Sequence, residues 1–335
     1  MYLEPSPSTR LFLPQSEGEI AALDRGIRAK LASSLAHIFD RAASTLGIED
    51  TDPGPLLSEI RTHRQAPSVF AKYFELVFAL KAKRHDEAAG LWRQIAAAAQ
   101  EAPIFAVAPL AADALGEDAA RFVRLLNAGE KGPIFGPPDR SHWPAFAAGV
   151  AEAFDLLGQT DAALAAETRA SILLVIGSAP LSPALSFGGV TSLTLWGAVT
   201  LNTELHRTPL EIAEGLVHEG AHTLLFGYAA DERLVRNPDS ERFASPLRPD
   251  PRPMDGVFHA TFVCARLCLL CRRLLERRPR SLPGFDPRAI EKKMVDMANR
   301  FDDGARLIAD KANLTPLGEK LLRSTVDYMA HDAAA

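Results

Sequence analysis

Residues 208–222 read TPLEIAEGLVHEGAH, and this stretch predicts the helix around which the rest of the chain is organised. Thr208 is a favourable N-cap, Pro209 suits the first helical position, and Glu211 completes a capping box three residues after the cap. Aliphatic side chains then recur at helical spacing, at Ile212, Leu216 and Val217. The start of the helix and its apolar face are therefore both encoded locally.

The quoted stretch ends in His-Glu-x-x-His, formed by His218, Glu219 and His222. Histidines four residues apart share one helical face, about 6 Å apart along the axis, so both imidazoles can bind one metal ion. Glu219 can reach a metal-bound water or a ligand nitrogen. Two surface histidines on an amphipathic helix would give the same motif, but this helix continues through an apolar run to Phe226. Unpartnered imidazoles on such a buried element would be costly, which favours a metal site.

Length and composition limit the class of protein. A chain of 335 residues is long enough for about two domains. Its 47% hydrophobic and 24% charged residues are ordinary for a soluble globular protein, and the net charge of -5 argues against a nucleic-acid-binding surface. No apolar run reaches the roughly 18 residues of a membrane span, and the first residues lack the pattern of a signal peptide. We therefore expect a cytoplasmic protein with neither nucleic acid nor membrane as a partner.

The three cysteines, Cys264, Cys268 and Cys271, have the C-x3-C-x2-C spacing of radical-SAM iron–sulfur ligands. Such ligands sit in loops, whereas these cysteines lie inside a run that reads as one continuous helix. Offsets of four and seven place all three thiols on one helical face and spread them over two turns. We expect buried core thiols rather than a cluster.

The helical and strand-forming segments predict a mainly α (α+β) fold. Residues 1–160 show helical periodicity, including an alanine-rich stretch at 103–128 that predicts two helical pieces, and no cluster of chemistry-bearing residues. Strand formers appear at 171–177 and 188–201. We expect a helical domain of unknown role at 1–160 and a metal-binding catalytic domain at 161–335, with a small sheet packed on a helical core. A strand edge beside the histidine helix could bind an extended peptide, although a plain buried strand pair is equally compatible.

A long loop follows the histidine helix, from about Tyr228 to Pro253, and it contains SPLRPDPRP. Loops of this length without regular structure are often functional, and the prolines stiffen this one. Arg248 and Arg252 are presented on the stiff segment and suit bidentate binding of a carboxylate. A solvated basic loop is the alternative.

Two helical histidines leave a metal site incomplete. Glu241 has roughly the spacing of the third ligand in thermolysin-type peptidases, but it lies in a proline-bounded loop without helical pattern. The metzincin pattern needs a histidine that TLLFGY does not supply. His259, in the apolar helix after the arginine loop, is the remaining candidate. Three histidines with open positions would suit iron(II) as well as zinc.

The segments VHEGAH (217–222) and FASPLRPDPRPMDGVFHATFV (243–263) resemble the HExxH-type 2-oxoglutarate-dependent peptide β-hydroxylases. These enzymes are associated with ribosomally made, post-translationally modified peptides. The resemblance covers about residues 171–276, a third of the chain, and leaves the helical N-terminal half without a counterpart. It implies an iron(II) dioxygenase that consumes 2-oxoglutarate and oxygen to hydroxylate the β-carbon of a peptide side chain. The implied partner is a peptide substrate, which can include a leader segment.

Carried over residue by residue, the resemblance implies His218, His222 and His259 as iron ligands and Arg252 or Arg248 as the anchor for the 2-oxoglutarate carboxylate. Three histidines depart from the two-histidine, one-carboxylate pattern of most such oxygenases. Arg266, two helical turns beyond His259, is a weaker third candidate for the anchor.

Two further functions remain open. The first is a zinc metallopeptidase in which Glu219 is the catalytic base that activates a zinc-bound water. The second is a non-enzymatic helical binding protein with a structural metal. The arginine loop discriminates between the enzymes, since a peptidase needs no anchor for a co-substrate carboxylate.

Overall fold

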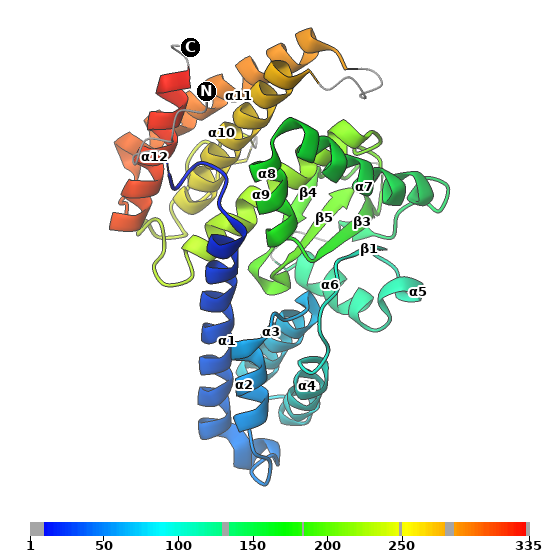
Figure 1. Ribbon diagram of the computed structural model, residues 1–335. Coiled ribbons are helices and arrows are strands. Elements are labelled where there is room, and N and C mark those ends of the chain that lie inside the picture. The colour runs from blue at the N-terminus through cyan, green and yellow to red at the C-terminus, as the bar shows by residue number, and fades with distance from the viewer. Residues whose placement is uncertain (1–9, 129–133, 183, 248–249, 279–284, 333–335) are drawn as a thin grey trace.

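The computed structural model describes the chain except residues 1–9, 129–133, 183, 248–249, 279–284 and 333–335. The described residues are mainly helical and include one small mixed sheet, as the sequence predicts (Figure 1). The helices are α1 (Glu17–Leu46), α2 (Gly54–Thr62), α3 (Pro67–Lys81), α4 (His85–Ala98), α5 (Ala112–Leu115), α6 (Asp118–Leu126), α7 (Trp143–Thr160), α8 (Ala162–Ser171), α9 (Pro209–Tyr228), α10 (Met254–Arg277), α11 (Pro287–Lys311) and α12 (Pro316–Asp332).

The sheet has the strand order β1-β3-β5-β4, with β2 paired to the end of β3. Its strands are β1 (Ala106–Pro109), β2 (Phe135–Gly136), β3 (Leu174–Pro180), β4 (Gly189–Thr191) and β5 (Ala198–Asn202). The central strand β3 runs parallel to β1 and β5, whereas β4 is antiparallel to β5. The strands β1 and β4 are therefore the two edges of the sheet, on opposite sides of β3 and β5.

Helices cover both faces of this sheet, which explains why β3 begins with consecutive aliphatic residues, at 174–176. Alternate residues of a strand point to opposite faces. Leu174 and Ile176 pack in a core with Phe122 of α6, while Val175 packs in another core with residues of α7 and α9 such as Leu216. Burial on both faces fixes the position of β5 and, through it, of the edge strand β4.

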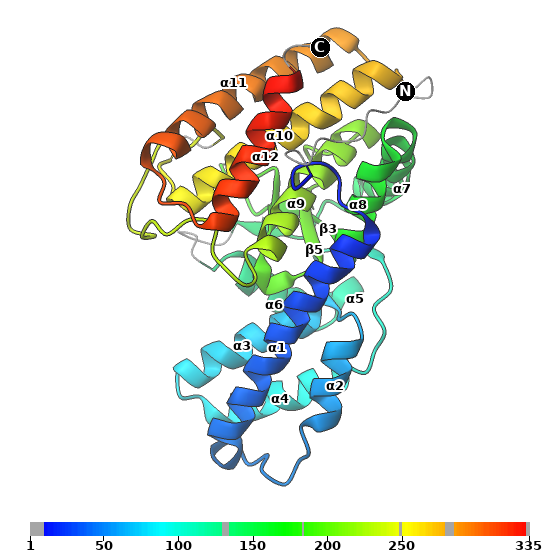
Figure 2. The same cartoon turned by 60° about the vertical axis from the view of Figure 1, so that its left-hand side comes forward.

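The helices α1 to α4 form a separate lobe below the sheet, and α1 runs from that lobe up to the rest of the molecule (Figures 1 and 2). A capping box of Ser16 and Glu19 starts α1, and Gly47 ends it in the left-handed conformation. Where α1 meets the upper part, Asp24 accepts a hydrogen bond from Trp196 Nε1 at 3.0 Å and pairs with Arg28 at 2.7 Å. This buried contact joins the lobe to the segment that precedes β5.

The expectation of two helical pieces over 103–128 is wrong at its start, because residues 106–109 form β1. Pro103 and Pro109 limit any helix in this segment, and pairing with β3 outweighs the helical propensity of its alanines. The helical half of the chain therefore contributes β1 and β2 to the sheet. The division of the chain at residue 160 stays a prediction.

The helix α10 is the buried centre of the upper part, packed against α9, α11 and α12. Its length and composition are those of a membrane-spanning helix, but 89% of its apolar window is buried inside the protein. Cys264, Cys268 and Cys271 all lie in this one helix, free and buried, as the sequence predicts. Burial raises the pKa of each of these thiols to about 12, which makes them inert core side chains.

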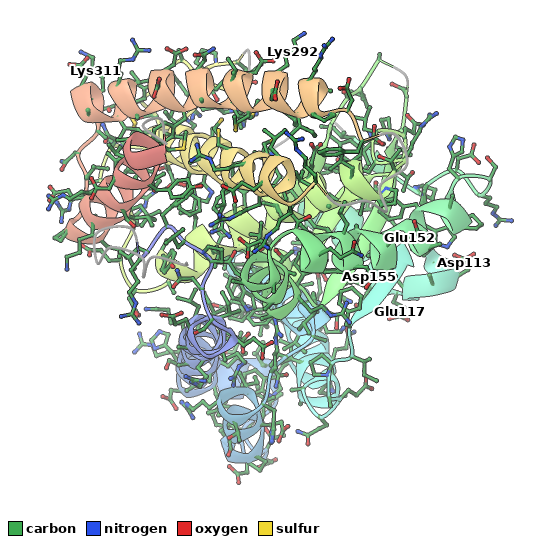
Figure 3. All side chains as sticks on the ribbon, turned by 45° about the horizontal axis from the view of Figure 1, so that its top comes forward. Asp113, Glu117, Glu152, Asp155, Lys292 and Lys311 are labelled. Carbon is green, nitrogen blue, oxygen red and sulfur yellow. The ribbon has the colours of Figure 1, made fainter. Side chains whose placement is uncertain are left out.

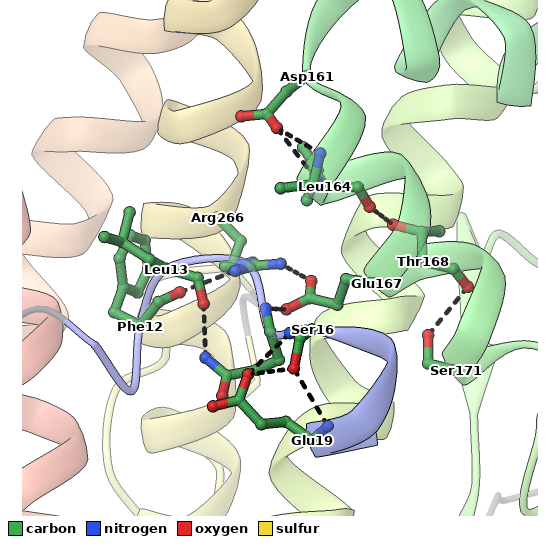
Figure 4. Close-up of polar contacts among 12 residues, drawn as sticks. Phe12, Leu13, Ser16, Glu19, Asp161, Leu164, Glu167, Thr168, Ser171 and Arg266 are labelled. Carbon is green, nitrogen blue, oxygen red and sulfur yellow. Dashed lines mark hydrogen bonds and ion pairs between the residues drawn. The ribbon is translucent and has the colours of Figure 1, made fainter. Parts of the chain in front are cut away.

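The segment before α1 is held against α8 and α10 by a buried ion pair between Arg266 and Glu167 (Figure 4). Arg266 also donates to the carbonyl of Phe12 at 2.8 Å, and Glu167 accepts from the amide of Gln15 at 2.7 Å. The guanidinium of Arg266 is therefore used to hold this segment in place. Arg266, the third candidate for the co-substrate anchor, is not among the residues that line the cavity described below.

Candidate functional site

The helix α9 starts as the sequence predicts. Thr208 accepts from the amide of Glu211, and the carboxylate of Glu211 accepts from the amide of Thr208 at 2.9 Å. The apolar face of α9, including Ile212 and Leu216, packs into the core that lies between α7, α9 and one face of the sheet. This packing directs His218 and His222 away from the core and into a cavity of about 760 Å³.

The cavity brings His259 of α10 to the same place. The Nδ1 atoms of His222 and His259 are 3.0 Å apart, and the two rings stack with centroids 5.2 Å apart and an interplanar angle of 18°. The ring of Phe226 lies 5.1 Å from that of His259 and closes one side of the pair. Complete burial lowers the pKa of His259 to about 4, so its imidazole is neutral near pH 7 and can offer a lone pair.

The third predicted ligand, His218, lies one turn earlier on α9. Its ring centroid is 5.2 Å from that of His222, and it lines the same cavity. Within the described residues, no group of three or more histidine, cysteine, aspartate or glutamate side chains is arranged to hold a metal ion. The three imidazoles therefore line one cavity without being arranged around a common ion position.

Glu219 is only 2% exposed and faces the edge strand β4. The hydroxyl of Thr191 donates to its Oε2 at 2.7 Å, while its Oε1 lies 3.8 Å from Nε2 of His218. Gly189 approaches so closely that a Cβ there would collide with Oε1. The carboxylate is thus fixed by β4 on one side and lies beside a histidine on the other.

The remaining wall of the cavity is formed by the arginine loop. Arg252 lines it, and its backbone pairs with Phe243 in an isolated bridge. Its Nε lies 2.9 Å from Oδ2 of Asp250, outside hydrogen-bonding geometry, and that nitrogen is buried without a hydrogen-bond partner among the described residues. Arg248, the other predicted anchor, lies outside the described residues. Glu241 accepts from Asn237 at 3.0 Å on the surface and is not among the residues that line the cavity.

Sequence reasoning missed three residues that shape the site. Asp255 lies four residues before His259, with Oδ2 3.9 Å from its Nε2, and burial raises the pKa of that carboxyl group. Its i, i+4 spacing from His259 on a helix was a usable signal. Thr191 and Gly189 contact the side chain of Glu219, although they lie 28 and 30 residues before it in the sequence. No local sequence pattern identifies them.

The fold and cavity together define a mainly helical protein that carries an HExxH helix, a third histidine from the neighbouring helix and an arginine within one cavity. No family model and no curated protein matches the chain.

Proposed function

We propose that this protein is an iron(II)- and 2-oxoglutarate-dependent oxygenase that hydroxylates a peptide side chain at its β-carbon. The observation that carries the proposal is the presence of Arg252 in the same cavity as His218, His222 and His259. A cavity with three histidines and one arginine suits a metal together with an anionic co-substrate.

The donor atoms fit a divalent metal. Two nitrogen ligands at about 2.1 Å from one ion, at a right angle, are about 3.0 Å apart, which matches the separation of the His222 and His259 Nδ1 atoms. Two neutral imidazoles can share at most one proton at that distance, so a metal ion satisfies both lone pairs better than a single hydrogen bond does. His218 would supply the third nitrogen.

When bound, iron(II) and 2-oxoglutarate would supply the oxidant: one oxygen atom enters the substrate C–H bond and the other enters succinate as carbon dioxide is lost. The part of Arg252 is to hold a carboxylate of the co-substrate by a charge-assisted pair. Its current partner, Asp250, is over half exposed, so exchange of that carboxylate for another anion loses little.

The edge strand β4 supports a peptide as the substrate. It lines the cavity from residue 189 to residue 191 and pairs on one side only, with β5. An extended peptide can add to such an edge through backbone hydrogen bonds and present one side chain to the metal. Phe187, just before β4, and Phe226 give that side chain apolar walls.

A zinc metallopeptidase remains the second candidate, because Glu219 lines the cavity next to His218. A peptidase base must release and take up a proton from water at the metal. Glu219 is buried, and one of its oxygens is held by Thr191. This environment suits a side chain that orients its neighbours better than one that exchanges protons with water.

The proposal is tested on protein purified without oxygen. Metal analysis is followed by an assay of succinate release with iron(II), 2-oxoglutarate and oxygen, with His222→Ala as the inactive control. We expect iron-dependent succinate release that the variant lacks. Peptide hydrolysis that depends on zinc and disappears in Glu219→Gln, without succinate release by the iron-loaded protein, would establish the peptidase instead.

A further inference from the structure

A second cavity lies at the opposite edge of the sheet from the histidines. It has a volume of about 550 Å³ and is enclosed by β1, α7 and α8. Most of its lining residues are apolar, among them Phe105, Val107, Ala147, Val150, Phe154 and Ala166. The strands β3 and β5 separate it from β4, so the two edges are about 14 Å apart. The residues of the proposed oxygenase site take no part in it.

The outer edge of β1, beside this cavity, pairs with no other strand among the described residues. The amide of Ala106 donates to the carbonyl of Leu173 at 2.9 Å, and that of Leu110 donates to Gly177 at 2.8 Å. Because peptide groups alternate in direction along a strand, the N–H and C=O of Val107 point away from β3. A strand that added here would gain backbone hydrogen bonds and place alternate side chains in the cavity.

An apolar side chain is exposed next to β1. Ile104, just before β1, is 85% exposed. The guanidinium of Arg169 lies 3.6 Å from the ring centroid of Phe105, which also packs edge-on against Phe154. A partner that buries these groups would remove apolar surface from water.

The surroundings of the cavity are acidic. Figure 3 shows Asp113, Glu117, Glu152 and Asp155 on one side of the molecule, around α5 and α7. Asp155 itself lines the cavity, in which Arg169 is the opposing charge among the described lining residues. A second copy of this chain would bring a second acidic rim against the first, which is unfavourable. A cationic partner would be attracted.

We infer that the β1 edge is a docking site for an extended peptide segment that alternates apolar and basic residues. Its backbone pairs with β1 at Val107, and its apolar side chains fill the cavity between α7 and α8. Its basic side chains point to the opposite face of the sheet, towards Asp113 and Glu117 beside α5. This site is independent of the proposed function, since it uses the other edge of the sheet.

The test is fluorescence anisotropy of the full-length protein with a nonapeptide of alternating valine and lysine that carries an uncharged fluorophore. The comparison peptides are the valine–glutamate version and a version N-methylated at alternate residues. Ala151→Trp fills the cavity from an exposed position on α7, and Ala148→Trp, exposed on the same helix but outside the cavity, is its matched control. Asp113→Lys reverses an exposed acidic charge on α5, with the exposed Asp296→Lys on α11 as its control.

We expect the valine–lysine peptide to bind at least tenfold more tightly than the other two peptides. Ala151→Trp should weaken binding at least tenfold and Ala148→Trp less than twofold. Asp113→Lys should weaken binding about threefold at low salt, and this difference should shrink in high salt. Equal affinity for the lysine and glutamate peptides would overturn the inference, as would equal effects of the two tryptophan variants. A dimer in sedimentation experiments that Ala151→Trp alone disrupts would identify a second copy as the occupant and overturn it too.

Discussion

His222 and His259 come from different helices, yet their Nδ1 atoms lie 3.0 Å apart and their rings stack at 18°. The capped helix α9 holds His222 and the buried helix α10 holds His259, so the pair is a product of the fold. We expect His222→Ala and His259→Ala each to reduce bound iron or zinc at least tenfold, because too few nitrogen donors remain. Metal content is measured after anaerobic purification. The exposed His63→Ala is the control, and wild-type metal content in either cavity variant would place the site elsewhere.

Arg252→Lys tests the co-substrate anchor. Lysine keeps the charge but loses the planar fork, and a charge-assisted hydrogen bond contributes about 1.5–3 kcal/mol. The concentration of 2-oxoglutarate for half-maximal succinate release should therefore rise about tenfold or more. Metal content should not change, since Arg252 is not a proposed ligand. Arg233→Lys changes a surface arginine that pairs with Asp239 and should behave as wild type. An unchanged requirement in Arg252→Lys would remove the anchor from the proposal.

The buried pair of Arg266 and Glu167 should be costly to break. Glu167→Gln leaves a buried guanidinium without a countercharge, so we expect the free energy of unfolding to fall by about 3–5 kcal/mol in urea titrations. Replacing both residues with methionine should cost less than the single change, because no uncompensated charge remains. A double variant that is less stable than Glu167→Gln would contradict this account.

Gly304 marks the closest approach of α11 to α10. A Cβ at this position would collide with Oγ1 of Thr261, so Gly304→Ala should destabilise the protein by about 1–3 kcal/mol. Adding Thr261→Ala should recover part of that loss. Gly26 of α1 has open space around it, and Gly26→Ala should raise stability by about 0.5–1 kcal/mol. Equal effects of the two alanine substitutions in thermal or urea unfolding would show that the helices are not closely packed there.

His206 should make stability depend on pH. Burial lowers its pKa below the ordinary value of 6.5, against a smaller opposing effect of its hydrogen bond to Asn202. Below about pH 6.5 the unfolded chain is protonated at this residue while the folded protein is still neutral there. The unfolded state then binds more protons, so the free energy of unfolding falls as the pH is lowered through that value. His206→Gln should reduce the loss between pH 8 and pH 5.5; an equal loss in both proteins would count against this cause.

The parts of the fold that local chemistry determines could be predicted from the sequence. The capping box and apolar face of α9, the helix that carries the three cysteines, and the aliphatic strand β3 all agree with expectation. The strand β1 could not be predicted, because its alanine-rich sequence favours a helix and only pairing with β3 makes it a strand. Long-range contacts determine such segments.

The candidate site shows the same division. The positions of His218 and His222 on one face follow from their spacing, and their meeting with His259 in one cavity agrees with the sequence-based expectation. Their roles as metal ligands stay predictions. Arg266 pairs with Glu167 across 99 residues of sequence, and Thr191 donates a hydrogen bond to Glu219 across 28 residues. No sequence motif encodes either contact.

Because β4 contacts Glu219 directly, the strand at the edge of the cavity and the helix α9 have to move together. The hydroxyl of Thr191 donates to the carboxylate of Glu219, which follows His218 in the sequence. Gly189 lies so close to the same carboxylate that there is no space between the strand and that side chain. A sideways shift of β4 must therefore displace Glu219, and with it the turn of α9 that carries the first histidine. A polypeptide that bound to β4 and displaced it would therefore move the imidazole of His218 without contacting it.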